Sequence, residues 1–172
     1  EGADELFFGY DRIFKWASAL SENQFKISDF LSNYSYSIEK NLPTERSKEY
    51  VMNMLKMKKP IEFLEDFFID FHLSGLLRRM DFASMAASKE ARVPFVTKKL
   101  FEYLYRKPFE TRNENGISKS ILRKMCKESG LYNCINLKKV GFSVSGKAAT
   151  QFNRSMEYEV FYKKQLRLLG WL

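Results

Sequence analysis

The chain has 172 residues, enough for one domain with a sizeable core, and 45% hydrophobic with 29% charged residues is a globular composition. This composition excludes a disordered tail, and no apolar stretch reaches the roughly 18 uncharged residues that a membrane span needs. Lysine and arginine outnumber aspartate and glutamate by 29 to 21, which gives a net charge of +8. Such a charge suits nucleic acid, an anionic surface or a phosphate-bearing substrate, and does not choose among them.

Hydrophobic periodicity predicts that the chain is mainly helical, with no strand alternation and no internal repeat. The predicted helices cover residues 5–20, 45–57, 61–79, 98–105, 119–129 and 148–169. Thr44, Thr97 and Ser118 precede three of them and are expected as N-caps. Pro60 suits the first turn of the third helix, and the composition of residues 113–116 predicts a turn.

Cysteine and histidine are scarce. Cys126 and Cys134 are too few for a zinc or redox motif, and a reducing, cytoplasmic compartment is the simplest expectation. The single histidine, His72, excludes a histidine-rich metal site. It lies in an apolar helical run, so we expect a core or interface histidine.

The first ten residues, Glu1-Gly2-Ala3-Asp4-Glu5-Leu6-Phe7-Phe8-Gly9-Tyr10, place three carboxylates and a glycine ahead of an amphipathic helix. A structural interpretation is a helix cap, with Asp4 accepting hydrogen bonds from free amides and Glu5 complementing the helix dipole. The run also resembles the Gly-Glu-Gly-Ser/Ala-Asp-Glu-x-Phe-x-Gly-Tyr motif of glutamine-dependent asparagine synthetases, with Phe8 in place of a common glycine.

Three later segments resemble motifs of the same family in the same order. They are Met80-Asp81-Phe82-Ala83-Ser84-Met85-Ala86 with Glu90-Ala91-Arg92-Val93-Pro94-Phe95, then Lys119-Ser120-Ile121-Leu122-Arg123, then Lys139-Val140-Gly141-Phe142. Three positions depart from the pattern, namely Val96, Thr97 and Leu137, the last of which stands where the family has an arginine.

The resemblance implies that the chain uses ATP and magnesium. It places Asp4 at the pyrophosphate, as nucleotide-binding residue and magnesium ligand. A single aspartate is chemically sufficient, because magnesium takes few protein carboxylates beside phosphate oxygens. Glu1 would lie beside the acyl-adenylate and assist ammonia attack, and Gly2 fits a backbone that passes close to a ligand.

The same resemblance gives Lys119 and Lys139 catalytic contacts with the reacting phosphates. For Lys119 a helix N-terminus would add free amides to the ammonium group. Asp81 matches a position near the aspartate and nucleotide site, with a helix-capping role as an equal alternative. For Arg92 a structural role is favoured.

The family resemblance further implies a fold and a domain arrangement. Residues 1–172 would be the C-terminal, mainly α portion of an α/β synthetase domain of the adenine-nucleotide α-hydrolase-like (PP-loop) type. The Ser-Gly-Gly-x-Asp-Ser loop and the N-terminal cysteine of the family are absent from these residues. We therefore expect the PP-loop and a glutaminase domain upstream in the same chain, and no activity from the 172 residues alone.

The implied reaction is the adenylation of aspartate by ATP followed by attack of glutamine-derived ammonia, which gives asparagine, AMP and pyrophosphate. A homodimer is left open. One alternative is an amidotransferase of the same family that acts on another carboxylate. Another is a basic helical binding module with a degenerate site. Nucleic acid is disfavoured as its partner, because the aromatic residues do not interleave with the basic ones.

Overall fold

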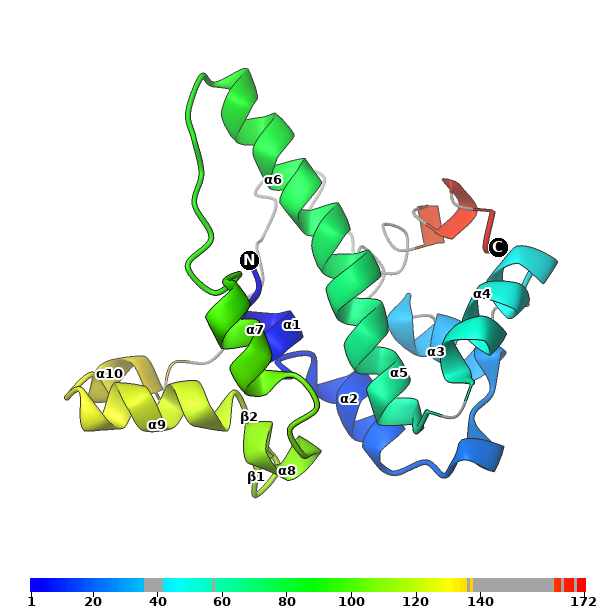
Figure 1. Ribbon diagram of the computed structural model, residues 1–172, viewed down its shortest axis with the longest axis horizontal. Helices are drawn as coiled ribbons and strands as arrows, with labels where there is room; N and C mark the ends of the chain where they lie inside the picture. Colours follow the sequence, from blue (N-terminus) through cyan, green and yellow to red (C-terminus); the bar gives the residue numbers. More distant parts are fainter. Residues whose placement is uncertain (36–41, 57, 136, 138–162, 165, 169) are drawn as a thin grey trace, which may run out of the picture. The chain divides into compact units, whose positions relative to one another are not determined.

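The computed structural model describes residues 1–35, 42–56, 58–135, 137, 163–164, 166–168 and 170–172. These residues form two compact units (Figure 1). Unit 1 consists of residues 1–19 and 59–136, and unit 2 of residues 20–58 and 137–172. The prediction of a mainly helical chain is confirmed for the described residues.

Unit 1 is built around a continuous helical run from Pro60 to Ala86 (Figure 1). The run consists of α5 (Pro60–Asp66), the π-helical segment η2 (Phe67–Leu73) and α6 (Ser74–Ala86). Pro60 occupies the first turn as predicted, because proline lacks only an N–H that has no partner there. The helix continues beyond the predicted end at residue 79.

The other elements of unit 1 are short. They are α1 (Ala3–Leu6), α2 (Asp11–Ser18), α7 (Lys98–Leu104), α8 (Phe109–Arg112), β1 (Asn113–Glu114), β2 (Ile117–Ser118), α9 (Ser120–Glu128) and α10 (Tyr132–Ile135). The predicted turn at residues 113–116 is confirmed. It joins β1 to β2 in an antiparallel hairpin. Strands of two residues are too short to show an alternating pattern in the sequence. Asn115 and Gly116 both have positive φ, as the turn of a tight hairpin requires.

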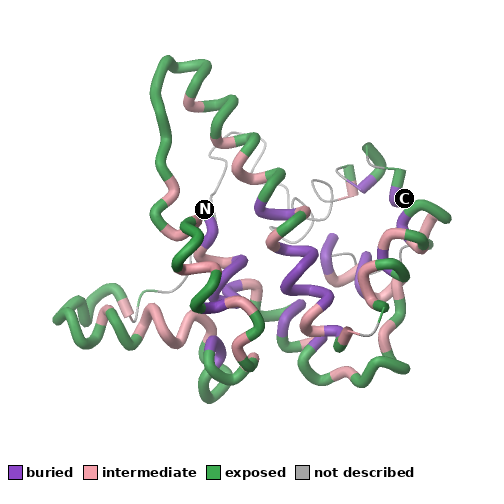
Figure 2. Tube along the Cα trace, viewed as in Figure 1, coloured by how far each residue is buried: buried purple, intermediate pink, exposed green. Residues whose placement is uncertain are grey.

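Buried aromatic side chains make up much of the core of unit 1. Figure 2 colours the buried residues purple, among them much of α5 and η2. Phe14 of α2 packs against Phe68 of η2, with ring centroids 5.0 Å apart, and against Phe8 at 4.4 Å. A second cluster joins Leu6 and Phe7 to Leu104 of α7. The residues between α1 and α2 therefore bridge the two halves of the core.

Two predictions were wrong: that residues 5–20 form one unbroken helix, and that Ser118 is an N-cap. The single helix expected over residues 5–20 is broken between Leu6 and Asp11, where Phe8 adopts a left-handed conformation with φ 54° and buries its ring. Ser118 does not cap α9. Its N-cap is Lys119, also left-handed, with φ 56°. In both places tertiary contacts outweigh the local helical pattern.

Unit 2 contains η1 (Glu22–Gln24), α3 (Ile27–Tyr34) and α4 (Glu45–Leu55), with α3 packed against α4. Thr44 caps α4 as predicted, since its hydroxyl oxygen accepts a hydrogen bond from the Ser47 amide at 3.3 Å. The same hydroxyl donates to the Gly170 carbonyl at 2.6 Å, and Trp171 packs on Tyr50. The last residues of the chain are thereby held against the start of α4.

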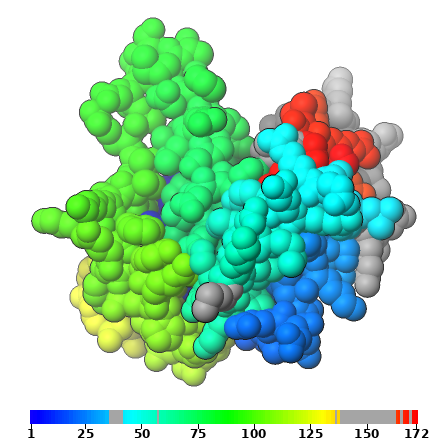
Figure 3. Space-filling model, turned by 45° about the vertical axis from the view of Figure 1, so that its right-hand side comes forward, coloured from blue at the N-terminus to red at the C-terminus, as the bar shows by residue number. Residues whose placement is uncertain are grey.

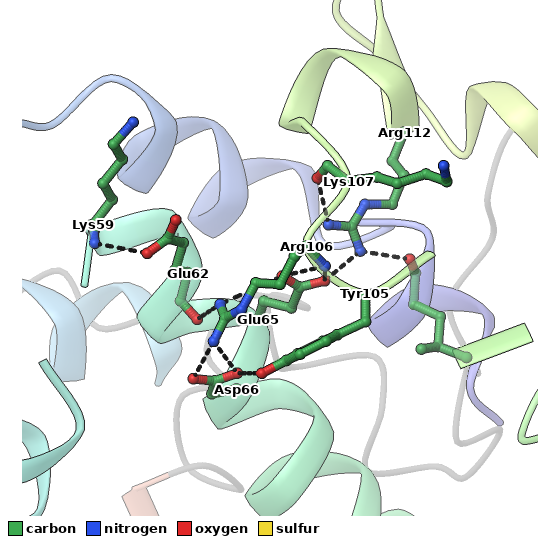
Figure 4. A network of polar contacts seen from close by, with 9 residues as sticks. Lys59, Glu62, Glu65, Asp66, Tyr105, Arg106, Lys107 and Arg112 are labelled. Atoms are coloured by element: carbon green, nitrogen blue, oxygen red, sulfur yellow. Dashed lines mark hydrogen bonds and ion pairs between the residues drawn. The ribbon is translucent and has the colours of Figure 1, made fainter. Parts of the chain in front are cut away.

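A network of four charges, three of them buried and the fourth, Arg106, partly exposed, ties α5 to α8 and to the segment before it (Figure 4). Arg112 is 1% exposed and donates to Glu65 at 2.6 Å, while Arg106 donates to both oxygens of Asp66 at 2.9 Å. Arg112 also donates to the Leu6 carbonyl at 3.2 Å. The charges cancel, and the network connects α5 to α1 as well as to α8.

Removing Arg112 takes away the 2.6 Å partner of the buried Glu65 carboxylate and leaves it only the partly exposed Arg106 guanidinium, at 3.6 Å. We expect Arg112→Met to lower the free energy of unfolding by about 3–5 kcal/mol. Arg92→Met is the matched control, because the Arg92–Glu90 pair has side chains that are 84% and 69% exposed and its loss should cost less than about 1 kcal/mol. Urea unfolding followed by circular dichroism measures both, and equal losses would contradict the assignment.

Candidate functional site

The candidate site lies in unit 1, where the first ten residues fold back on themselves. Gly2 has φ 93° and precedes α1, and its amide donates to the buried Glu5 carboxylate at 3.0 Å. A Cβ at Gly2 would lie 2.7 Å from Val96 Cγ2, so the close approach that requires glycine here is to the segment before α7. Glu5, rather than Asp4, is the carboxylate that caps this turn.

Asp4 pairs with Lys119, and this contact joins two predicted site residues that are far apart in the sequence. Asp4 Oδ1 lies 2.8 Å from Lys119 Nζ, and each side chain is about a quarter exposed, at 26% and 25%. The Lys119 backbone amide donates to the Phe7 carbonyl at 3.2 Å, which holds the start of α9 against the end of α1. A carboxylate and an ammonium group therefore meet at the starts of two helices, both still accessible to solvent.

Gly9 provides the space for this ion pair. A Cβ there would lie 2.0 Å from Asp4 Oδ1 and 2.3 Å from Lys119 Cε, so both side chains pass directly over the Gly9 backbone. The Gly9 amide donates to the Asp4 carbonyl at 2.8 Å. Glycine is required at position 9 because the Asp4–Lys119 pair approaches its backbone this closely.

The remaining predicted site residues are not all brought together. Glu1 Oε1 lies 4.0 Å from Nη2 of Arg79 in α6. Asp81 lies in the second half of α6, exposed, so the helix-capping alternative for Asp81 was wrong. In the part of the chain that the structure describes, its carboxylate forms no hydrogen bond or ion pair. Lys139 lies outside the described residues.

The segment around Asp81 is unusually open for a motif-bearing part of the chain. No residue of α6 is buried, and Phe82 and Met85 are 73% and 56% exposed. In Figure 3 the end of α6 and the residues after it, in green, stand out from the rest of unit 1. Asp81 is therefore not held against the Asp4–Lys119 pair by packing of the described residues.

The donor set fits a magnesium–phosphate ligand better than a metal held by protein alone. Among the described residues there is no cluster of three or more histidine, cysteine, aspartate or glutamate side chains that could hold an ion. Asp4 offers one accessible carboxylate beside one ammonium group. Magnesium binds through one or two carboxylates when phosphate oxygens and water complete its coordination.

Sequence reasoning missed a second polar group beneath the pair. The Tyr10 hydroxyl donates to Glu5 Oε1 at 2.6 Å and lies 3.2 Å from His72 Nε2. Glu5 and His72 are 1% and 6% exposed, which confirms His72 as a buried histidine. The signal in the sequence was Tyr10, a tyrosine within the amphipathic helix expected over residues 5–20, because a tyrosine that packs in a core needs a partner for its hydroxyl.

Burial sets the protonation of this group. It lowers the pKa of His72 to about 4, helped by the charge of Arg79 and opposed by that of Asp4. Burial also raises the pKa of Glu5, which the hydrogen bond from Tyr10 partly offsets. His72 is therefore neutral at pH 7.

Comparison with known proteins identifies the family of the chain. The model of the asparagine synthase family matches residues 1–172. Asparagine synthetase [glutamine-hydrolyzing] 3 of Bacillus subtilis (strain 168) is 30% identical over 139 residues, which are 72% of this chain and 22% of that protein. Asparagine synthetase [glutamine-hydrolyzing] 1 of the same organism is 35% identical over 80 residues, 45% of this chain and 13% of that protein. No solved structure gave a significant match.

The fold and the site together define the class of protein. It is a helical domain in which an aspartate–lysine ion pair joins the starts of two helices. The chain belongs to the asparagine synthase family. It spans less than a quarter of the length of these two curated relatives. Within the described residues, no helix is long and apolar enough to cross a membrane.

Gly9→Ala should separate Asp4 from Lys119, because the new methyl group would occupy the place of both side-chain ends. We expect the Lys119 amine to react several-fold faster with an acetylating reagent, and stability to fall by about 1 kcal/mol. Mass spectrometry of the acetylated chain measures the rate. Gly75→Ala is the control, since a Cβ there meets nothing within 4 Å. Unchanged Lys119 reactivity in Gly9→Ala would contradict this account.

His72 should make stability depend on pH. In the folded chain its pKa is about 4, below the ordinary 6.5, so the unfolded chain binds the proton first. The contribution of neutral His72 to the free energy of unfolding is fully present above pH 6.5. It is lost as the pH falls from 6.5 toward 4, by roughly 3 kcal/mol in total. Urea unfolding over this range should show a steeper loss for the wild type than for His72→Gln, which does not titrate. Parallel curves would show that His72 is not buried in its neutral form.

Proposed function

We propose that the chain is part of a glutamine-dependent asparagine synthetase. The β-carboxylate of aspartate attacks the α-phosphorus of ATP and pyrophosphate leaves. Ammonia derived from glutamine then attacks the activated carbonyl, and AMP leaves as asparagine forms. The observation that carries the proposal is the Asp4–Lys119 pair at 2.8 Å, in a chain that matches the asparagine synthase family over residues 1–172.

The pair supplies the two charges that this chemistry needs. Bound magnesium would screen the phosphate oxygens, and Asp4 is the residue that would hold it. Lys119 would neutralise charge on the departing pyrophosphate, aided by its position at the start of α9, where backbone amides are free. In the absence of phosphate the two side chains neutralise each other, which keeps the lysine oriented toward the carboxylate.

The family resemblance, rather than the structure, suggests roles for the remaining motif residues. Glu1 would act beside the activated carboxylate, directly before Gly2, the N-cap of α1. Gly2 and Asp81 would contribute to nucleotide binding, and Lys139 would provide a second cation for the phosphates. The PP-loop and the glutaminase would come from upstream domains of the same protein, so we expect the 172 residues alone to be inactive.

The test is aspartate-dependent release of AMP and pyrophosphate by the longest natural protein that contains these residues. Lys119→Met should lower the rate at least about 100-fold, because it removes a positioned charge from the transition state. Lys124→Met, an exposed lysine on the same helix, should leave the rate within about twofold. The isolated 172-residue chain should release neither product.

Three outcomes would change the proposal. Release that depends on another carboxylate, and not on aspartate, would identify a different acceptor for the same chemistry. No release with any carboxylate would favour a binding module with a degenerate site. Equal rates for Lys119→Met and Lys124→Met would remove Lys119 from the reaction.

A further inference from the structure

The second polar group, Glu5–Tyr10–His72, is joined to the proposed site through the chain, because Glu5 directly follows Asp4. Each member comes from a different place in unit 1, with Glu5 in α1, Tyr10 just before α2 and His72 in η2. The Tyr10 hydroxyl contacts both of the others, at 2.6 Å from Glu5 Oε1 and 3.2 Å from His72 Nε2. The two contacts of Tyr10 therefore link α1 to η2.

The direction of the hydrogen bonds follows from the donors available. Tyrosine has one hydroxyl proton, and in this geometry it is donated to the Glu5 carboxylate. The Tyr10 oxygen can then only accept from His72, which must carry its proton on Nε2. The relay therefore runs from His72 through Tyr10 to Glu5, and Glu5 in turn accepts from the Gly2 amide at 3.0 Å.

The aromatic neighbours fix the two rings of the relay. Phe68 stacks on Tyr10 with centroids 4.9 Å apart and lies 5.0 Å from the His72 ring. Both Phe68 and His72 belong to the π-helical segment, a rare geometry that is frequent at functional sites. The wider turn of η2 thus presents a donor and an aromatic surface to Tyr10 at once.

Burial excludes His72 and Glu5 from direct contact with substrate. They are 6% and 1% exposed, whereas Asp4 and Lys119 are each about a quarter exposed. The charges of Arg79 and Asp4 act on His72, and the Glu5 carboxylate lies 3.9 Å from its Nε2. The polar atoms of the relay are satisfied from within the chain, as buried polar groups must be. What the relay can do is hold the backbone that carries the exposed residues.

We propose that His72 and Tyr10 are positioning residues that act through Glu5 to fix the turn bearing Glu1, Gly2 and Asp4. Glu5 directly follows Asp4 in the chain and accepts a hydrogen bond from the Gly2 amide. A shift of the Glu5 carboxylate therefore moves both Gly2 and Asp4. This inference rests on the proposed function for its consequence in catalysis. The positioning itself is a property of the chain.

The test compares His72→Gln with His72→Phe in the longest natural protein that contains the chain. Glutamine places an N–H donor near the position of Nε2, whereas phenylalanine fills the site without a donor. Hydrogen exchange measured by mass spectrometry should show about tenfold faster exchange of the amides of residues 2–9 in His72→Phe, with wild-type protection in His72→Gln. Equal protection in all three proteins would overturn the proposal.

A kinetic readout separates positioning from loss of folded protein. In His72→Phe we expect the KM for magnesium–ATP to rise about 10-fold and kcat for pyrophosphate release to fall by a similar factor, with His72→Gln close to wild type. A fall in kcat alone, equal in both variants, would indicate a structural role and overturn the proposal. If the wild type releases no pyrophosphate, the proposed synthetase function fails, and hydrogen exchange still decides the relay.

Discussion

The reversal of the chain at Phe8 and Gly9 is the feature on which the candidate site depends. If α1 continued into α2 as one helix, Asp4 and Tyr10 would point along its surface, and neither could reach its partner. The left-handed Phe8 instead turns the chain so that the Gly9 amide meets the Asp4 carbonyl at 2.8 Å. Asp4 then lies over Gly9 beside Lys119, and Tyr10 returns to Glu5.

A left-handed conformation at a phenylalanine is costly and persists only where surrounding contacts compensate. Here the Phe8 ring is buried between Phe14 and Phe109, with centroids 4.4 and 5.7 Å away. The Arg112 guanidinium lies 3.6 Å above the same ring and donates to the Leu6 carbonyl. The charge network of α5 and α8 therefore supports the turn that carries the site, so its stability and the geometry of Asp4 are linked.

The sequence predicted those elements whose signals are local. Thr44 and Thr97 cap α4 and α7 because a threonine oxygen can satisfy a free amide without help from the rest of the fold. Phe8 and Lys119 could not be predicted in the same way, because their left-handed conformations come from contacts with Phe14, Arg112 and the Phe7 carbonyl. The motif resemblance identified Asp4 and Lys119 individually. Only the fold placed them 2.8 Å apart.

Asp4 and Glu5 show how two adjacent carboxylates acquire different tasks from their surroundings. Asp4 is partly exposed and faces an ammonium group, so it is available to a charged ligand. Glu5 is buried and receives hydrogen bonds from neutral donors, the Gly2 amide and the Tyr10 hydroxyl, which is an arrangement that fixes geometry. Exchanging these two residues would conserve composition and charge yet put the ligand-facing carboxylate in the core. The order of the two residues along α1 therefore decides their roles. It is Asp4 that pairs with Lys119, while Glu5 accepts hydrogen bonds in the core.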